Sequence, residues 1–306
     1  MLIVPINHLT SLDYLKRLMD AGVDEFYMGY MPREWYQKYG WEISSNKRYF
    51  PVIPHIIDQK KAAELISLIQ KSKKKIYLTL NELYYTAEQQ GLIFKIINLF
   101  ERLGIDGYIV ADLALILAMR EKRIDSKIHL SSCAGSYNLA AISFYRQFGI
   151  SRFILPQLIT AKETIYFLEN TPKEVQFEVF VLGEFCRYEN AFCFTSHGYH
   201  RENFCNTRFK KNIVDRKSGL RRSEPESLLP EAGVAWCNLC IIPRLMEYKG
   251  RIIFKLALRL SNMLGLDGFD LTLKAAELTK GKSINLRQCQ KLLGNICRKK
   301  SVCRVF

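Results

Sequence analysis

The regular alternation of short apolar stretches with amphipathic stretches is the feature that most constrains the fold of this chain. The strand candidates are rich in β-branched and aromatic residues and lie at residues 1–6, 25–30, 75–81, 107–111, 127–132, 152–156, 176–183 and 251–258. The helix candidates between them lie at residues 9–21, 58–72, 88–103, 112–123, 138–148, 160–169 and 241–249. Such alternation predicts βαβ units and a parallel sheet.

Eight strand and helix pairs over roughly 250 residues are what a closed barrel requires. An open, doubly wound sheet would give the same alternation. The strand count, and the lack of a G-x-G-x-x-G sequence after the first strand, favour an α/β fold of the (β/α)8 TIM-barrel type over residues 1–260. In either fold, functional side chains gather at the C-terminal ends of the strands.

Two long segments interrupt the alternation, and a third follows it. The insertion at residues 31–57 is typical of a lid or substrate loop, and its aromatic residues could stack on bases or pack against the barrel. Residues 184–240 form a longer, cysteine-rich loop, and residues 261–306 are expected to be a basic helical tail. The aromatic residues of the insertion are Trp35, Tyr36, Tyr39 and Trp41.

The cysteines are the strongest chemical signal. The chain has nine, and its first residues are expected to form a strand rather than a signal peptide, so a reducing cytoplasm is the expected compartment. Clustered thiols there predict a metal or iron–sulfur centre. Five of the cysteines fall in the long loop, at Cys186, Cys193, Cys205, Cys237 and Cys240.

Their spacing leaves several kinds of site open. Only Cys237 and Cys240 form a C-x-x-C pair, whereas a zinc ribbon needs two such pairs. His197 and His200 keep a mixed zinc site possible, and buried cysteines acting as small hydrophobic residues are the third interpretation.

Cysteines elsewhere carry less information. Cys133, which follows the fifth strand, is either a nucleophile or a small pocket residue. A second metal site in the tail would have to use Cys289, Cys297 and Cys303. The chain lacks the G-x-S-x-G, H-E-x-x-H and Walker A motifs.

The net charge of +15 suggests a polyanionic partner such as RNA. Residues 208–222 and 282–304 are strongly basic, which suits a phosphate backbone but also an ordinary solvated surface. No window approaches eighteen uninterrupted apolar residues, so we expect no membrane insertion.

Several strand ends together resemble peptidase family U-32, the collagenase-like peptidases. The resemblance covers most of residues 1–260, and FEVFVLGEFCRYENAFCF is its most specific part, with Gly-x-x-Cys after the seventh strand and a second cysteine seven residues later. The other parts are KIYLTLN, GIDGYIVADLALI, KIHLSSCAGSYN, Lys255-Leu-Ala-Leu-Arg259 and Leu239-Cys240.

The resemblance implies a barrel with a 4Fe-4S cluster held by four cysteines. Cys186, Cys193 and Cys205 match the first three ligands, and Cys240 or Cys237 would be the fourth. Relatives act in oxygen-independent hydroxylation of tRNA or rRNA bases or of ubiquinone precursors, several with prephenate as the implied oxygen donor. Some work with a second family subunit, and others are named peptidases.

The sequence departs from the family pattern at two strand ends. Pro156-Gln157-Leu158 replaces Arg-Glu-Leu after the sixth strand, so a guanidinium and a carboxylate are both lost. Ser131-Ser132-Cys133 replaces Ser-Thr-Gln after the fifth strand. These changes indicate a branch with its own substrate.

The prediction from the sequence is therefore an iron–sulfur enzyme of the hydroxylation type. Asn81, Asp112 and Asn138 would orient the substrate, and Arg187 or Lys255 would hold a carboxylate or phosphate. One alternative is a peptidase that uses Cys133, His197 or His200. Another is a zinc- or RNA-binding scaffold without catalysis.

Overall fold

The computed structural model describes most of the barrel and part of the two long segments. The described residues are 1–40, 43–47, 55–184, 189–193, 212–214, 218–219, 221–223, 235–258, 262–263, 266–280, 285, 287–288 and 291.

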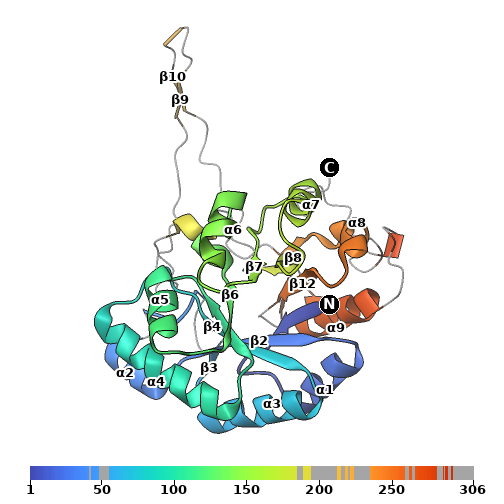
Figure 1. The fold of residues 1–306 in the computed structure, drawn as a ribbon. Coiled ribbons are helices and arrows are strands. Elements are labelled where there is room, and N and C mark those ends of the chain that lie inside the picture. The colour runs from blue at the N-terminus through green and yellow to red at the C-terminus, as the bar shows by residue number, and fades with distance from the viewer. Residues whose placement is uncertain are drawn as a thin grey trace.

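Eight parallel strands close into a barrel, as predicted (Figure 1). Each barrel strand pairs with the one that precedes it and the one that follows it in the chain, and β1 pairs with both β2 and β12, which closes the ring. The strands are β1 (Leu2–Pro5), β2 (Glu25–Tyr30), β4 (Lys75–Leu80), β5 (Gly107–Val110), β6 (Lys127–Leu130), β7 (Arg152–Ile154), β8 (Gln176–Glu184) and β12 (Ile252–Ala257).

Helices surround these strands and cover their apolar outer faces. They are α1 (Leu12–Asp20), α3 (Gln59–Lys71), α4 (Ala87–Leu103), α5 (Leu113–Glu121), α6 (Leu139–Arg146), α7 (Ala161–Glu169), α8 (Ile242–Leu245) and α9 (Gly268–Lys280). The main core lies between the strands and these helices, where Phe100, Phe153 and Phe177 are fully buried.

Polar caps explain where six of these helices begin. Each is preceded by a residue whose side chain accepts a hydrogen bond from a backbone N–H of the first turn, and such a cap contributes about 1 kcal/mol. Thr86 and Thr160 form complete capping boxes with Gln89 and Glu163. The six caps are Ser11, Asp58, Thr86, Asp112, Asn138 and Thr160.

The helix predicted at residues 241–249 is shorter than expected. Only Ile242–Leu245 is α-helical, and 3₁₀ turns at Leu239–Ile241 and Met246–Tyr248 flank it. Pro243 lies in the first turn of this helix, where the missing N–H is tolerated, so the proline does not account for the shortening.

The insertion after β2 contributes α2 (Arg33–Tyr39) and β3 (His55–Ile56), which pairs with β2. Trp35 is fully buried, donates from Nε1 to the Ile43 carbonyl at 2.8 Å and packs against Tyr39. Of the two roles proposed for this aromatic residue, the structure therefore shows packing. Trp41 lies outside the described residues.

The tail contributes a helix to the barrel wall. Leu271, Leu273 and Ala276 of α9 are buried in the main core, and the Phe269 ring packs edge-on against Tyr14 of α1 at 4.6 Å. The helix thus lies beside the first β/α unit and covers the closing seam at β1 (Figure 1). The predicted boundary at residue 260 remains a prediction.

Within the described residues, no helix has both the length and the apolar character needed to cross a bilayer.

Candidate functional site

The C-terminal mouth of the barrel gathers polar side chains from two neighbouring loops. Asn81 follows β4, and its amide nitrogen lies 3.3 Å from the Ser131 hydroxyl and 3.9 Å from the Cys133 sulfur. Its amide oxygen accepts a hydrogen bond from the backbone N–H of Lys47, at 3.2 Å. Asn81 therefore links the insertion to the end of β6, which is a position from which it can orient a substrate.

A buried ion pair lies next to Asn81 and was not predicted from the sequence. Lys47 Nζ is 3.4 Å from Glu82 Oε2, and the two side chains are 6% and 15% exposed. The other carboxylate oxygen, Oε1, is buried without a hydrogen-bond partner in the described part of the chain. Burial raises the pKa of Glu82 although Lys47 opposes that shift.

Asp112 is a helix cap and a loop anchor. Its Oδ1 accepts from the Ala114 N–H at 2.9 Å, and its Oδ2 accepts from the Tyr85 N–H at 3.1 Å. Burial raises the pKa of Asp112, against the effect of these hydrogen bonds. The Tyr85 hydroxyl in turn donates to the Ser45 carbonyl at 2.8 Å, so Asp112 helps to hold the insertion over the mouth.

Asn138, the third predicted substrate-orienting residue, caps α6. Its Oδ1 accepts from the Ala141 N–H at 2.9 Å, and the residue is exposed. The structure therefore places Asn138 at the start of α6, where it also lines a pocket beside the mouth, whereas Asn81 lies beside Ser131 and Cys133.

Lys255 lies inside the barrel in a layer of buried charges. Its Nζ is 2.7 Å from Glu178 Oε2 and 3.9 Å from the centre of the Tyr27 ring. Glu178 Oε1 faces His129 Nδ1 at 3.0 Å and Arg152 at 3.7 Å. The Lys255 ammonium group is therefore already engaged by a carboxylate of the protein.

Arg152 connects this layer across the barrel. Its guanidinium group pairs with Glu25 on β2, with one nitrogen 3.2 Å from Oε1. Because β2 and β7 are not neighbours in the sheet, this pair spans the barrel interior. Alternation along the strands predicts that some side chains face inward, but which strands oppose each other follows only from closure of the barrel.

The electrostatics of this layer favour one protonation state. Burial and the nearby Arg152 lower the pKa of His129 to about 4, and Glu178 opposes the shift. Burial acts to raise the pKa of Glu178, but Lys255, His129 and Arg152 together lower it well below its usual range. Near neutral pH, Glu178 is therefore ionised and the His129 imidazole is neutral.

The cysteine-rich loop leaves the barrel at β8. Gly183 has a φ of +150°, and a Cβ there would lie 2.6 Å from the Ala257 carbonyl carbon of β12. This close approach explains the glycine of the Gly-x-x-Cys sequence.

The chain returns to β8 through β11 (Ala235–Cys237), which pairs antiparallel to it, with Cys237 opposite Leu182. Cys237 and Cys240 are both buried, 5% and 4% exposed. Two of the predicted ligands thus lie at the end of the strand that leads to Cys186.

Cys193 follows a 3₁₀ turn at Asn190–Phe192, which contacts the Ser132–Ala134 turn after β6. The Phe192 ring stacks on Tyr137 at 5.6 Å, and Asn190 Nδ2 lies 3.5 Å from the Ser132 hydroxyl. The part of the loop that precedes Cys193 therefore packs on the turn that contains Cys133.

The described residues include no group of three or more histidine, cysteine, aspartate or glutamate side chains placed to hold a metal ion. The remaining predicted ligands and alternatives lie outside the described residues, and they are Cys186, Arg187, His197, His200, Cys205, Cys289, Cys297 and Cys303.

In a comparison with characterised sequences, the chain is similar to proteins that are named tRNA hydroxylation proteins. The chain is 32% identical over 126 residues to tRNA hydroxylation protein P of Escherichia coli (strain K12), which covers 41% of this chain and 27% of that protein. It is 21% identical over 181 residues to tRNA hydroxylation protein P2 of Bacillus subtilis (strain 168), which covers 59% and 52%. The matched region thus spans about a quarter to a half of these relatives.

A solved structure supports the fold. The U32 peptidase Mk0906 superimposes with a TM-score of 0.51 at 12% identity, covering 84% of this chain and 93% of that one. The sequence model of Peptidase family U32 matches residues 10–248, which include all barrel strands from β2 to β8 and the whole cysteine-rich loop. This chain belongs to Peptidase family U32.

Proposed function

We propose that this protein is an iron–sulfur enzyme that hydroxylates a base of tRNA in the cytoplasm, with its active site at the C-terminal mouth of the barrel. Relatives named tRNA hydroxylation proteins support the substrate class. The observation that carries the cluster site is the pairing of β11 with β8, because it returns Cys237 and Cys240 to the strand end that Cys186 follows.

The donor set fits a 4Fe-4S cluster chemically. Thiolates are the usual ligands of such clusters, and Cys186, Cys193, Cys205 and Cys240 would hold it, with Cys237 as the alternative fourth ligand. The apolar surroundings of Cys237 and Cys240 would limit solvent access on that side.

The protein side chains would bind and orient the substrate. The Asn81 amide can donate to a base carbonyl. When bound, the cluster would supply electron transfer or an open iron position. Prephenate as oxygen donor and a second family subunit are further parts of this proposal.

The first test is the metal content of protein purified without oxygen. We expect iron and labile sulfide, which are lost in Cys186→Ala, Cys193→Ala and Cys205→Ala and retained in the control Cys289→Ala. Comparing Cys237→Ala with Cys240→Ala identifies the fourth ligand. Colourless protein with stoichiometric zinc would contradict the cluster.

The second test is the nucleoside composition of tRNA from a deletion strain grown anaerobically. We expect a hydroxylated nucleoside to disappear, to return with the wild-type gene, and to depend on prephenate in the purified system. An unchanged nucleoside profile would contradict tRNA hydroxylation. Iron-independent peptide cleavage that is lost in Cys133→Ala would instead establish a peptidase.

A further inference from the structure

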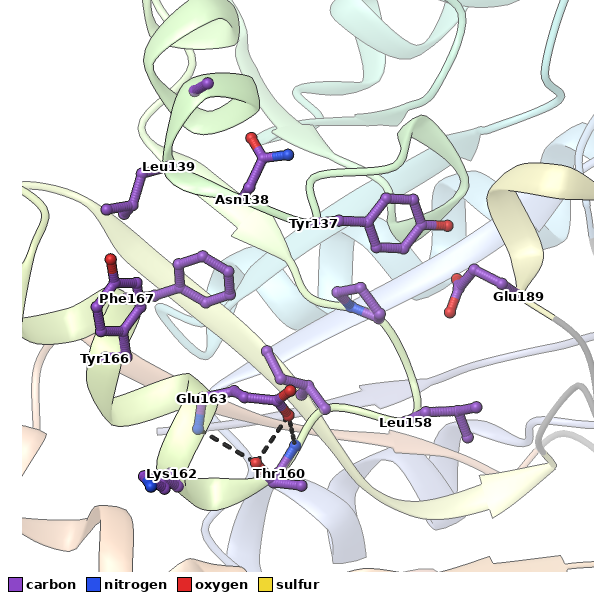
Figure 2. A pocket seen from close by; sticks show the side chains of 13 residues that line it. Tyr137, Asn138, Leu139, Leu158, Thr160, Lys162, Glu163, Tyr166, Phe167 and Glu189 are labelled. Carbon is purple, nitrogen blue, oxygen red and sulfur yellow. Dashed lines mark hydrogen bonds between the residues drawn. The ribbon is translucent and has the colours of Figure 1, made fainter.

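A pocket of about 1010 Å³ lies between α6 and α7, outside the barrel interior (Figure 2). Its walls come from the loop before α6, the loop and helix after β7, and Glu189 of the cysteine-rich loop. The loop before α6 and the loop after β7 both follow the C-terminal ends of strands, so the pocket opens at the same end of the molecule as the mouth.

Three aromatic rings, those of Tyr137, Tyr166 and Phe167, stand among the aliphatic and polar residues that line this α6–α7 pocket. Tyr166 is 54% exposed and Phe167 beside it is 5% exposed, so the first can meet a ligand and the second supports it from below. On the opposite side, Tyr137 is held by its stacking on Phe192. Figure 2 shows Tyr137 and the pair Tyr166 and Phe167 on different sides of the cavity.

Two polar groups face each other beside the Tyr137 ring. The buried Tyr137 hydroxyl interacts with the Glu189 carboxylate. One of the Glu189 oxygens also accepts from the Asn190 N–H at 2.9 Å. Burial raises the pKa of both Tyr137 and Glu189.

This combination matches an unstacked nucleobase. Proteins hold the splayed bases of RNA loops by stacking them on aromatic side chains and by hydrogen bonds to their edges. A base offers a flat face to Tyr166, and N–H groups to the Glu189 carboxylate, which lines the pocket. Lys162 on the same wall can meet a flanking phosphate.

The contacts with the cysteine-rich loop tie this pocket to the mouth. Asn190 and Phe192 pack on the Ser132–Tyr137 turn, so Glu189 and Cys193 are held by the same contact. We infer that the α6–α7 pocket binds an unstacked base of the RNA that neighbours the base presented to the mouth. This inference rests on the proposed function, because it takes tRNA as the substrate.

The test is the affinity of purified protein for total tRNA from the deletion strain, measured at several salt concentrations. We expect Tyr166→Ala to weaken binding roughly tenfold, because replacing a stacking aromatic with alanine costs about 1–3 kcal/mol per base. Tyr166→Phe should restore binding. The slope of log affinity against log salt should stay unchanged, because no phosphate contact is removed.

Phe144→Ala is the matched control, since Phe144 is an exposed aromatic residue (42%) on α6 that does not line the pocket. Ultraviolet crosslinking of bound tRNA should mark the peptide that contains Tyr166. Wild-type affinity of Tyr166→Ala, or equal losses in Tyr166→Ala and Phe144→Ala, would overturn the inference.

The same experiment separates the two proposals. A wild-type protein that hydroxylates tRNA while Tyr166→Ala binds normally would contradict the pocket and leave the function standing. A wild-type protein that binds tRNA through Tyr166 without hydroxylating it would support the pocket and contradict the proposed function. If wild-type protein binds no tRNA, both proposals fail.

Discussion

The barrel interior and the barrel mouth both contain buried charges, but they differ in how these charges are matched. In the interior, Glu178 is shared by Lys255, Arg152 and His129, and Arg152 also pairs with Glu25. At the mouth, Glu82 has one cationic partner, Lys47. In both regions one carboxylate oxygen is buried without a hydrogen bond of good geometry among the described residues, Glu82 Oε1 at the mouth and Glu178 Oε1 in the interior, so the regions differ in the number of charged partners.

The difference separates a structural layer from a candidate binding surface. A buried charge is costly unless it is paired, so the interior layer is expected to be sensitive to loss of any member. The Lys47–Glu82 pair has fewer charged partners and lies beside Asn81 at the mouth, so a change there is expected to affect substrate binding more than folding. Substitutions in the two regions should therefore differ in whether they change stability or activity.

The largest expected effect is on stability, from the interior. Glu178→Ala leaves the buried Lys255 without its carboxylate partner and should lower the free energy of unfolding by about 3–5 kcal/mol. Chemical denaturation measures this change. The surface pair Arg146–Glu174 is the control, and Glu174→Ala should cost less than about 1 kcal/mol. Equal effects of the two substitutions would remove the distinction.

A pH dependence should come from the same layer. The folded chain lowers the pKa of His129 from 6.5 to about 4, so the unfolded chain binds the proton more readily between these values. The resulting stability is present above pH 6.5 and is lost as the pH falls towards 4, by an amount on the order of 3 kcal/mol. Denaturation across this range should show a smaller loss for His129→Gln than for wild type. Parallel pH curves would show that His129 is not the responsible group.

At the mouth, activity should change more than stability. Asn81→Ala removes the group that joins Lys47, Ser131 and Cys133, and we expect tRNA hydroxylation to fall about tenfold, equivalent to ~1.4 kcal/mol. Asn170→Ala is the control, since Asn170 ends α7 at the opposite end of the barrel. If Asn81→Ala lowered the free energy of unfolding as much as Glu178→Ala does, the role of Asn81 would be structural.

The smallest effect concerns Asn138, which the sequence suggested as a substrate-orienting residue and the structure shows as a cap. Asn138→Ala should lower the free energy of unfolding by about 1 kcal/mol, and Asn138→Ser should largely retain it, because serine also caps helices well. Thermal unfolding of the two variants measures the difference. A destabilisation of Asn138→Ser that matches that of alanine would contradict the capping role.

Local sequence signals predicted the barrel well. All eight strands were predicted from β-branched and aromatic runs, and Thr86 and Thr160 precede helices that begin where capping boxes indicate. The helix predicted at residues 241–249 is shorter in the structure, where 3₁₀ turns flank the α-helical residues Ile242–Leu245. The ligand set of the proposed cluster remains a prediction, since Cys186 and Cys205 lie outside the described residues.

No local sequence pattern predicted three other features of the molecule: the charged layer, the Lys47–Glu82 pair and the α6–α7 pocket. Each joins residues far apart in the chain, such as Glu25 with Arg152 and Tyr137 with Glu189. The sequence by itself determined the order and type of the elements, because strand periodicity and helix caps act over a few residues. Only the tertiary structure decided which side chains meet, because closing the barrel brings opposite strands and separate loops together.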